Sequence, residues 1–381
     1  MKKSEAVFAL AQFISPKVQD KNVLEQLFQS VENDWEMIIQ QANRYLLVPA
    51  LYVSLKEKNL YDKLEDKMLQ EYLYEMYKLN KQRNEAIILQ VQELCSYLGA
   101  IEVTPLLLKG SSALSEHYFD DDAQRSMMDI DIAVPETKIF EAITLLKQKG
   151  YKEIDPTQEL GKTWHHYRRL YREDRATSVE LHRMVINHKA MKFMADFEKT
   201  KDTQSATDIS NARVLSPTYE LYYTFLHSEV SHEYHTKIIT LRHLHHSAVF
   251  IHKYQNEIDF EKLQALVEKY NLQKIWYEYL WLLKELFAID TPLTIPAQKH
   301  YVKQVCHNID TEKSFWWWIK VWIKKIIDVF SFETLQRKCD GLEHRYQLIY
   351  FIPKRFFFLG YKILTDTAKR KVILKGIKTT V

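Results

Sequence analysis

The sequence has few of the residues that interrupt helices. Its 381 residues include only 7 glycines and 9 prolines, and long stretches are rich in Leu, Lys, Glu and Gln, which favour helix. Apolar residues make up 46% of the chain and aromatic residues 13%, which excludes a disordered, self-repelling chain. We therefore expect a folded, mostly helical protein with a limited sheet, divided into two or three packed units.

Cysteine, net charge and long apolar runs are also scarce. Cys95, Cys306 and Cys339 are far apart and odd in number, so neither a disulfide framework nor a Cys-x-x-Cys zinc site is predicted, and a reducing cytoplasm fits. The formal net charge of +3 is too small to indicate a nucleic-acid partner by its magnitude. Because no run of about twenty uncharged apolar residues occurs, no transmembrane helix is predicted.

The hydrophobic period changes twice along the chain. A helical period up to about residue 98 gives way to short strand-like segments and returns after Pro217. The expected strands are 104–108, 128–134, 164–171 and 177–183. This order predicts an α+β fold in which a small mixed β-sheet, within 102–215, is flanked by a helical N-terminal region, 1–101, and a helical C-terminal region, 216–381.

Two carboxylates stand one residue apart on a predicted strand. Side chains alternate between the faces of a strand, so Asp129 and Asp131 project to the same side, while Ile130 and Ile132 face the other layer. Adjacent carboxylates repel one another unless a cation or water lies between them. Mg²⁺, or Mn²⁺ in its place, suits such oxygen ligands and also takes substrate phosphate as a ligand.

Glu180 lies on another alternating strand and adds a third carboxylate if the two strands are neighbours. Three carboxylates can hold two metal ions, which stabilise the attacking and leaving oxygens of a phosphoryl displacement. His182, two residues further on, lies on the same side of this strand as Glu180. It is either a phosphate or acid/base contact or a hydrogen-bonded structural histidine.

Upstream, a glycine and two serines follow a buried strand. At this strand-to-helix turn, Gly110, Ser111 and Ser112 offer N–H groups and hydroxyls to a triphosphate. Lys109 and Arg125 are placed to neutralise phosphate charge. An isolated Asp-x-Asp is common without any site, so the stronger signal is the ordered series of strand, Gly-Ser turn, short helix and Asp-x-Asp strand.

These motifs resemble one known family. Segments 108–114 (LKGSSAL), 125–131 (RSMMDID) and 179–182 (VELH) are similar to the uncharacterised nucleotidyltransferase family of the DNA polymerase beta-like superfamily. The similarity extends to the helical segment 42–52 and toward residue 250. Two positions depart from the family pattern, Glu180 and His246, where Asp is expected more often.

The resemblance implies a nucleotidyltransferase core that moves a nucleoside monophosphate from a triphosphate to an acceptor and releases pyrophosphate. It assigns the metal to Asp129, Asp131 and Glu180 and the phosphates to Gly110 and Ser111. ATP is the expected donor, and the acceptor is a small molecule, a protein or an RNA. The alternative is a non-catalytic module that binds a nucleotide or a partner protein on the same scaffold.

The C-terminal part carries a separate signal. Segment 315–330 places Trp and Lys on a helical pattern, and residues 353–381 contain eight Lys or Arg against one acid. Such a helix either packs into a helical domain or lies at a membrane surface. A cytoplasmic protein with peripheral membrane contact is therefore the second expectation for location.

Overall fold

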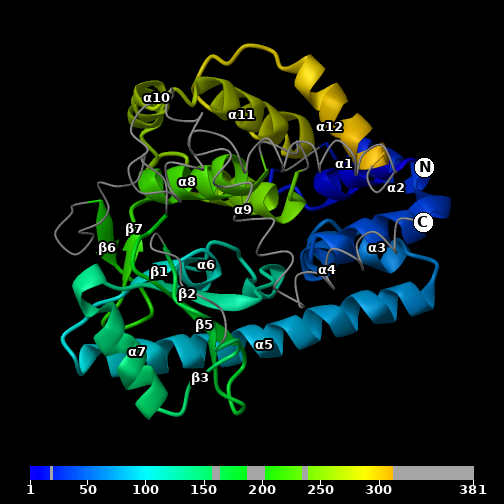
Figure 1. The fold of residues 1–381 in the computed structure, drawn as a ribbon. Helices are drawn as coiled ribbons and strands as arrows, with labels where there is room; N and C mark the ends of the chain where they lie inside the picture. The colour runs from blue at the N-terminus through cyan, green and yellow to red at the C-terminus, as the bar shows by residue number, and fades with distance from the viewer. Residues whose placement is uncertain (18–19, 157–163, 187–201, 234–238, 312–381) are drawn as a thin grey trace, which may run out of the picture. The chain divides into compact units, whose positions relative to one another are not determined.

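The chain is represented by a computed structural model (Figure 1). It describes residues 1–17, 20–156, 164–186, 202–233 and 239–311. Met1–Glu159 and His165–Asp310 form one compact unit. The three-part division of the chain stays a prediction. The Trp-rich segment 315–330 and the basic tail lie outside the described residues.

One mixed sheet contains seven strands in the order β3-β4-β5-β2-β1-β7-β6. β2 is central, because it pairs in parallel with β5 and antiparallel with β1. The strands are β1 Leu106–Leu108, β2 Asp129–Ala133, β3 Lys152–Glu153, β4 Leu170–Tyr171, β5 Ser178–His182, β6 Thr203–Ser205 and β7 Arg213–Leu215. The predicted α+β class is confirmed, and the sheet also contains β3, β6 and β7, which are too short to show a period in the sequence.

Five α-helices precede the sheet. They are α1 Lys3–Phe13, α2 Lys21–Ser30, α3 Trp35–Arg44, α4 Val48–Glu57 and α5 Lys67–Gly99. The carboxylate of Asp66 accepts hydrogen bonds from the first N–H groups of α5. Because no proline or glycine occurs between Lys67 and Gly99, this helix reaches 33 residues. Its buried stripe includes Ile87, Val91 and Leu94 at helical spacing.

The helices after the sheet share a core with the first helices. They are α8 Pro217–Phe225, α9 Leu241–Tyr254, α10 Phe260–Lys269, α11 Gln273–Phe287 and α12 Lys299–Thr311, with a π-helical turn, Leu226–Glu233, after α8. Phe225 meets Trp276 edge to face, with ring centroids 4.9 Å apart. The Ser15 hydroxyl, just after α1, donates to the Phe287 carbonyl. No helix among the described residues is both long and apolar enough to cross a membrane.

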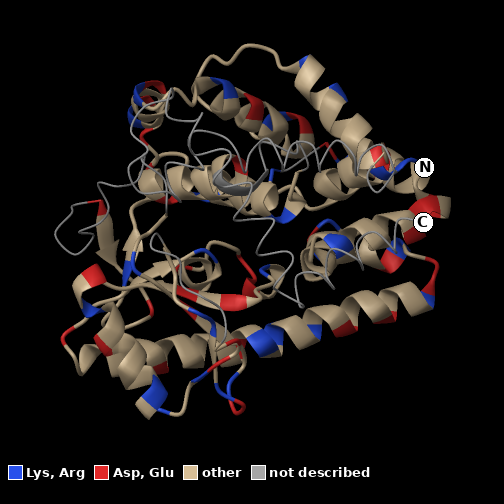
Figure 2. Cartoon of the chain, in the orientation of Figure 1, with Lys and Arg blue, Asp and Glu red and all other residues tan. Residues whose placement is uncertain are grey.

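Two short helices connect the strands of the site. α6, Gly110–Ser115, follows β1 directly, and α7, Ile139–Gln148, follows β2 and buries Ile143 and Leu146. In the view of Figure 1, β1 and β2 lie between α5 below and α8 and α9 above. Figure 2 shows Lys and Arg interspersed with Asp and Glu along α5. The helices thus cover the sheet while β2 and β5 stay side by side.

Candidate active site

Strand pairing brings the three predicted carboxylates together. In the parallel register of β2 and β5, Asp131 pairs with Glu180 and Asp129 pairs with Ser178. Asp129, Asp131 and Glu180 therefore occupy one face of two adjacent strands, while Ile130 and Ile132 are buried in the other layer. Asp131 and Glu180 are themselves buried, with side chains only 3% and 8% exposed.

Each of these carboxylates contacts a side-chain nitrogen of a lysine, histidine or arginine. Lys109 Nζ lies 2.8 Å from Asp131 Oδ1, and His182 Nε2 lies 2.9 Å from the same oxygen. Arg169 bridges the other two carboxylates, with Nε 2.6 Å from Glu180 Oε1 and Nη2 3.0 Å from Asp129 Oδ2. Cationic groups therefore offset part of the repulsion that three neighbouring carboxylates create.

The two aspartates have opposite electrostatic environments. Burial opposes ionisation of Asp131, but the hydrogen bond from His182 and the charge of Lys109 outweigh it and hold the pKa of Asp131 well below its ordinary value. Burial raises the pKa of Asp129, and the charges of Asp131 and Glu180 raise it further. A cation at this face would lower the energy of the fully ionised set.

The turn between β1 and α6 has a conformation that the sequence did not reveal. Lys109, not the following glycine, has a positive φ of 54° with ψ −119°. A non-glycine residue in such a conformation costs about 1–3 kcal/mol, which the surrounding structure must offset. Gly110 has a different role, because a Cβ there would lie 2.6 Å from the Met127 side chain.

The serines of this turn differ in their bonding. Ser111 is buried, and its hydroxyl makes no hydrogen bond with any described residue. The Ser112 hydroxyl instead lies 2.7 Å from the hydroxyl of Tyr118, within the core. Ser111 is therefore available to a ligand oxygen, whereas Ser112 is already engaged.

Arg125 is buried beside the site. Its side-chain Nε and Nη1 make no hydrogen bond within the described part of the chain. Burial, reinforced by the charge of Arg242, lowers the pKa of Arg125 to about 9, against the opposing influence of the carboxylate of Asp131. Side chains of Asn80 and Asn84 on α5 donate to its backbone carbonyl. The helix thus fixes the backbone at Arg125, whose side-chain Nε and Nη1 have no acceptor among the described residues.

The structure therefore gathers most of the predicted site residues. Lys109 and His182 contact Asp131 directly, and Arg169 connects Asp129 with Glu180. Gly110 and Ser111 belong to the turn that carries Lys109, whereas Ser112 faces Tyr118. Arg125 is buried, and its charge acts on both aspartates.

Arg169 was missed by the reasoning from sequence. β4 and β5 form an antiparallel pair in which Leu170 lies opposite Val179. One residue further from the turn, Arg169 comes opposite Glu180. A hairpin of the predicted strands 164–171 and 177–183, centred between residues 174 and 175, would have this same register, so the sequence contained the signal that an arginine would face the third carboxylate.

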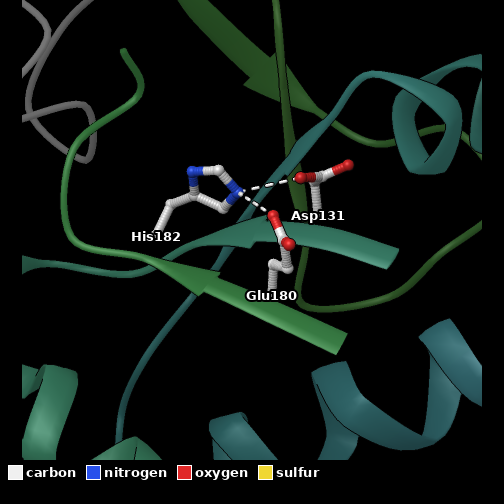
Figure 3. A group of neighbouring side chains, drawn as sticks. All are labelled: Asp131, Glu180 and His182. Carbon is white, nitrogen blue, oxygen red and sulfur yellow. Dashed lines mark hydrogen bonds and ion pairs between the residues drawn. The ribbon is translucent and has the colours of Figure 1, made fainter. Parts of the chain in front are cut away.

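A metal ion would find a suitable donor set here. One ligand atom from each of Asp131, Glu180 and His182 lies within 4.8 Å of the other two, and all three residues are buried (Figure 3). Buried carboxylate oxygens and an imidazole nitrogen that converge in this way are ligands of divalent cations in proteins.

A comparison with protein-family models identifies the family of the chain. The model of the family described as uncharacterised nucleotidyltransferase matches residues 31–288, more than half of the chain. The protein therefore belongs to that family, as the motifs around Gly110 and Asp129 indicated. Comparisons with curated proteins and with solved structures gave no match.

Proposed function

We propose that this protein transfers a nucleoside monophosphate from a nucleoside triphosphate, with ATP as the expected donor, to an acceptor hydroxyl or similar nucleophile. The observation that supports this function best is the shared face of Asp129, Asp131 and Glu180 on two adjacent strands. Such a face suits a divalent cation and the phosphates that accompany it. Membership of a nucleotidyltransferase family supports the same reaction class.

The reaction breaks one phosphoanhydride bond. The acceptor oxygen attacks the α-phosphorus, the bond from that phosphorus to the bridging oxygen of the β-phosphate breaks, and pyrophosphate leaves, while the acceptor loses its proton to water or to a carboxylate. Bound divalent metal would stabilise the charge on the attacking and leaving oxygens. Asp129, Asp131 and Glu180 would hold it.

Three groups of the chain are suited to the triphosphate. The Lys109 ammonium group contacts Asp131 beside the other carboxylates of the site, and the Lys109 side chain is 24% exposed. The Ser111 hydroxyl and the Arg125 guanidinium are polar groups whose hydrogen-bonding capacity is unused within the described residues. Phosphate oxygens supply the acceptors that these donors need, because charge-assisted hydrogen bonds to phosphate are strong.

One observation favours a second candidate, a non-catalytic binding module on the same scaffold. Arg169 bridges two of the three carboxylates, and Lys109 contacts the third. A site whose charges are offset by its own side chains can be stable without metal, as in a protein that binds nucleotide or a partner without turnover.

Peripheral membrane contact through 315–330 and the basic tail is a separate proposal about residues outside the described part.

Calorimetry with ATP, GTP, CTP and UTP, each with Mg²⁺ or Mn²⁺, tests the site. Wild type is compared with Asp129→Asn/Asp131→Asn and with Asp62→Asn, a control whose carboxylate is 80% exposed and pairs with Lys56. Metal-dependent triphosphate binding should be lost only in the double variant, because removing both charges removes the cation's ligands.

Pyrophosphate release then separates the two candidates. Release that needs metal and a defined acceptor, and that disappears in Asp129→Asn/Asp131→Asn, supports the enzyme. Triphosphate binding without release across small-molecule, protein and RNA acceptors supports the binding module. If none of the four triphosphates binds with either metal, both nucleotide proposals are wrong.

A further inference from the structure

His182 lies on β5, the same strand as Glu180, and its imidazole lies among the carboxylates of the site. Alternation along β5 places both side chains on one face. Nε2 of His182 lies 2.9 Å from Asp131 Oδ1 and 3.8 Å from Glu180 Oε2. Figure 3 shows this nitrogen directed between the two carboxylates. A ligand atom for a cation is therefore provided by nitrogen as well as by oxygen.

The bonding of His182 is incomplete for a purely structural histidine. Its ring is buried, with the side chain 3% exposed. Nδ1, the nitrogen remote from the carboxylates, makes no hydrogen bond among the described residues. A buried structural imidazole normally satisfies both nitrogens. Among the described residues, the hydrogen bond of the His182 ring is the one between Nε2 and Asp131, and this ring packs beside those of His165 and His166.

The oxygens beside Nε2 have free capacity. Among the described residues, the side chains of Lys109 and His182 both contact Oδ1 of Asp131, and Arg169 Nε contacts Oε1 of Glu180. Nitrogens of His182 and His166 lie 3.8 Å and 3.9 Å from Glu180 Oε2, too far for a hydrogen bond. Asp129 pairs with Arg169 and lies beside the converging set of Asp131, Glu180 and His182 without being one of its members.

We propose that Asp131, Glu180 and His182 form a metal centre with one imidazole ligand, which takes a divalent transition-metal ion such as Mn²⁺ in preference to Mg²⁺. The inference rests on the proposed function and specifies the class of its metal. Mg²⁺ prefers an all-oxygen shell with several waters, whereas imidazole binds first-row transition metals. A nitrogen ligand therefore strengthens binding of Mn²⁺ more than binding of Mg²⁺.

The surroundings also determine how firmly the ion is held. Ligating histidines usually donate their second N–H to a carbonyl or carboxylate, and such partners raise metal affinity about 10- to 100-fold. His182 has no such partner within the described residues. We expect an exchangeable ion, which can be titrated, rather than a tightly held structural one.

The test uses MnCl₂ and the full-length, nucleotide-free protein. Electron spin-echo envelope modulation of bound Mn²⁺ detects coupling to a directly ligated imidazole nitrogen, and Mn²⁺ titration with Mg²⁺ competition gives the two affinities. The variant is His182→Gln, whose amide can still donate to Asp131 but has no ring nitrogen. His166→Gln is the matched control for the other nearby imidazole, whose Nδ1 lies 3.9 Å from Glu180 Oε2 but is 2.9 Å from the Tyr167 carbonyl.

We expect nitrogen coupling in wild type and His166→Gln, and its loss in His182→Gln together with Mn²⁺ affinity at least about tenfold weaker. Mg²⁺ affinity should change much less. Bound Mn²⁺ without nitrogen coupling in wild type would overturn the inference, even if His182→Gln failed to fold, and would leave the carboxylate site of the proposed function intact. Coupling that survives in His182→Gln also overturns it. Absence of any bound Mn²⁺, with or without ATP, would overturn both the inference and the metal-dependent function.

Discussion

Arg169 occupies the space between two carboxylates that a cation would also approach. Its guanidinium contacts Glu180 at 2.6 Å and Asp129 at 3.0 Å, and its side chain is 50% exposed. A metal ion that uses either carboxylate must compete with this group. We predict that Arg169→Gln, which removes the competing charge, binds divalent metal more tightly than wild type when no nucleotide is present.

The magnitude follows from the two ion pairs. A fully buried hydrogen bond to a charged group contributes about 1.5–3 kcal/mol. Because Arg169 is half exposed, water and salt reduce each pair to about 0.5–1 kcal/mol. Two pairs then oppose metal binding by about 1–2 kcal/mol, which corresponds to about 5- to 30-fold in the dissociation constant.

Mn²⁺ titration followed by electron paramagnetic resonance measures this change directly. Arg168→Gln is the matched control, because the neighbouring arginine pairs with Glu153 at 3.1 Å instead. The control should bind Mn²⁺ as wild type does. Equal or weaker Mn²⁺ binding by Arg169→Gln would refute the reasoning and would show that the guanidinium does not compete with the ion.

Three further predictions concern neighbouring groups. Arg125→Gln should weaken triphosphate binding by about 10- to 100-fold in calorimetry, since it removes charge-assisted hydrogen bonds to phosphate; unchanged affinity would exclude a phosphate contact. Asn84→Ala should lower the free energy of unfolding in urea by about 1–3 kcal/mol, because Asn84 Nδ2 donates to the carbonyls of Asp122 and Arg125; a change below about 0.5 kcal/mol would contradict this. Although burial opposes it, contacts with Asp208 and Asp122 raise the pKa of His117 above its ordinary 6.5, so its stabilisation is complete below that value and is lost as pH rises through the folded-state pKa. The stability difference between wild type and His117→Gln should therefore be larger at about pH 5.5 than at about pH 8.5, and a difference independent of pH would reject the ion-pair explanation.

The local pattern of the sequence determined the central strands and the face of the site. Alternation in segments 128–134 and 177–183 placed Asp129, Asp131 and Glu180 on strands, because the period of two is a property of the extended backbone itself. The Gly-Ser turn was also predictable from the sequence, because glycine and serine mark a strand-to-helix junction. Family membership followed from these motifs in their order along the chain.

Other features depended on contacts between residues distant in sequence. The strands β3, β6 and β7 are two or three residues long, too short for a period, and they form only because neighbouring strands supply hydrogen-bond partners. The positive φ of Lys109 is likewise held by its surroundings, including its contact with Asp131. A lysine in the sequence does not indicate that its φ will be positive.

The residues of the site depend partly on the local sequence pattern and partly on tertiary contacts. Local geometry was enough to place acidic side chains on one strand face, because the covalent backbone sets the direction of alternate residues. Three features came from tertiary contacts: β5 lies parallel beside β2, Arg169 bridges Asp129 and Glu180, and His182 forms a group with Asp131 and Glu180. These arrangements depend on which strands pair and in which register, and that choice is made by packing across the whole sheet.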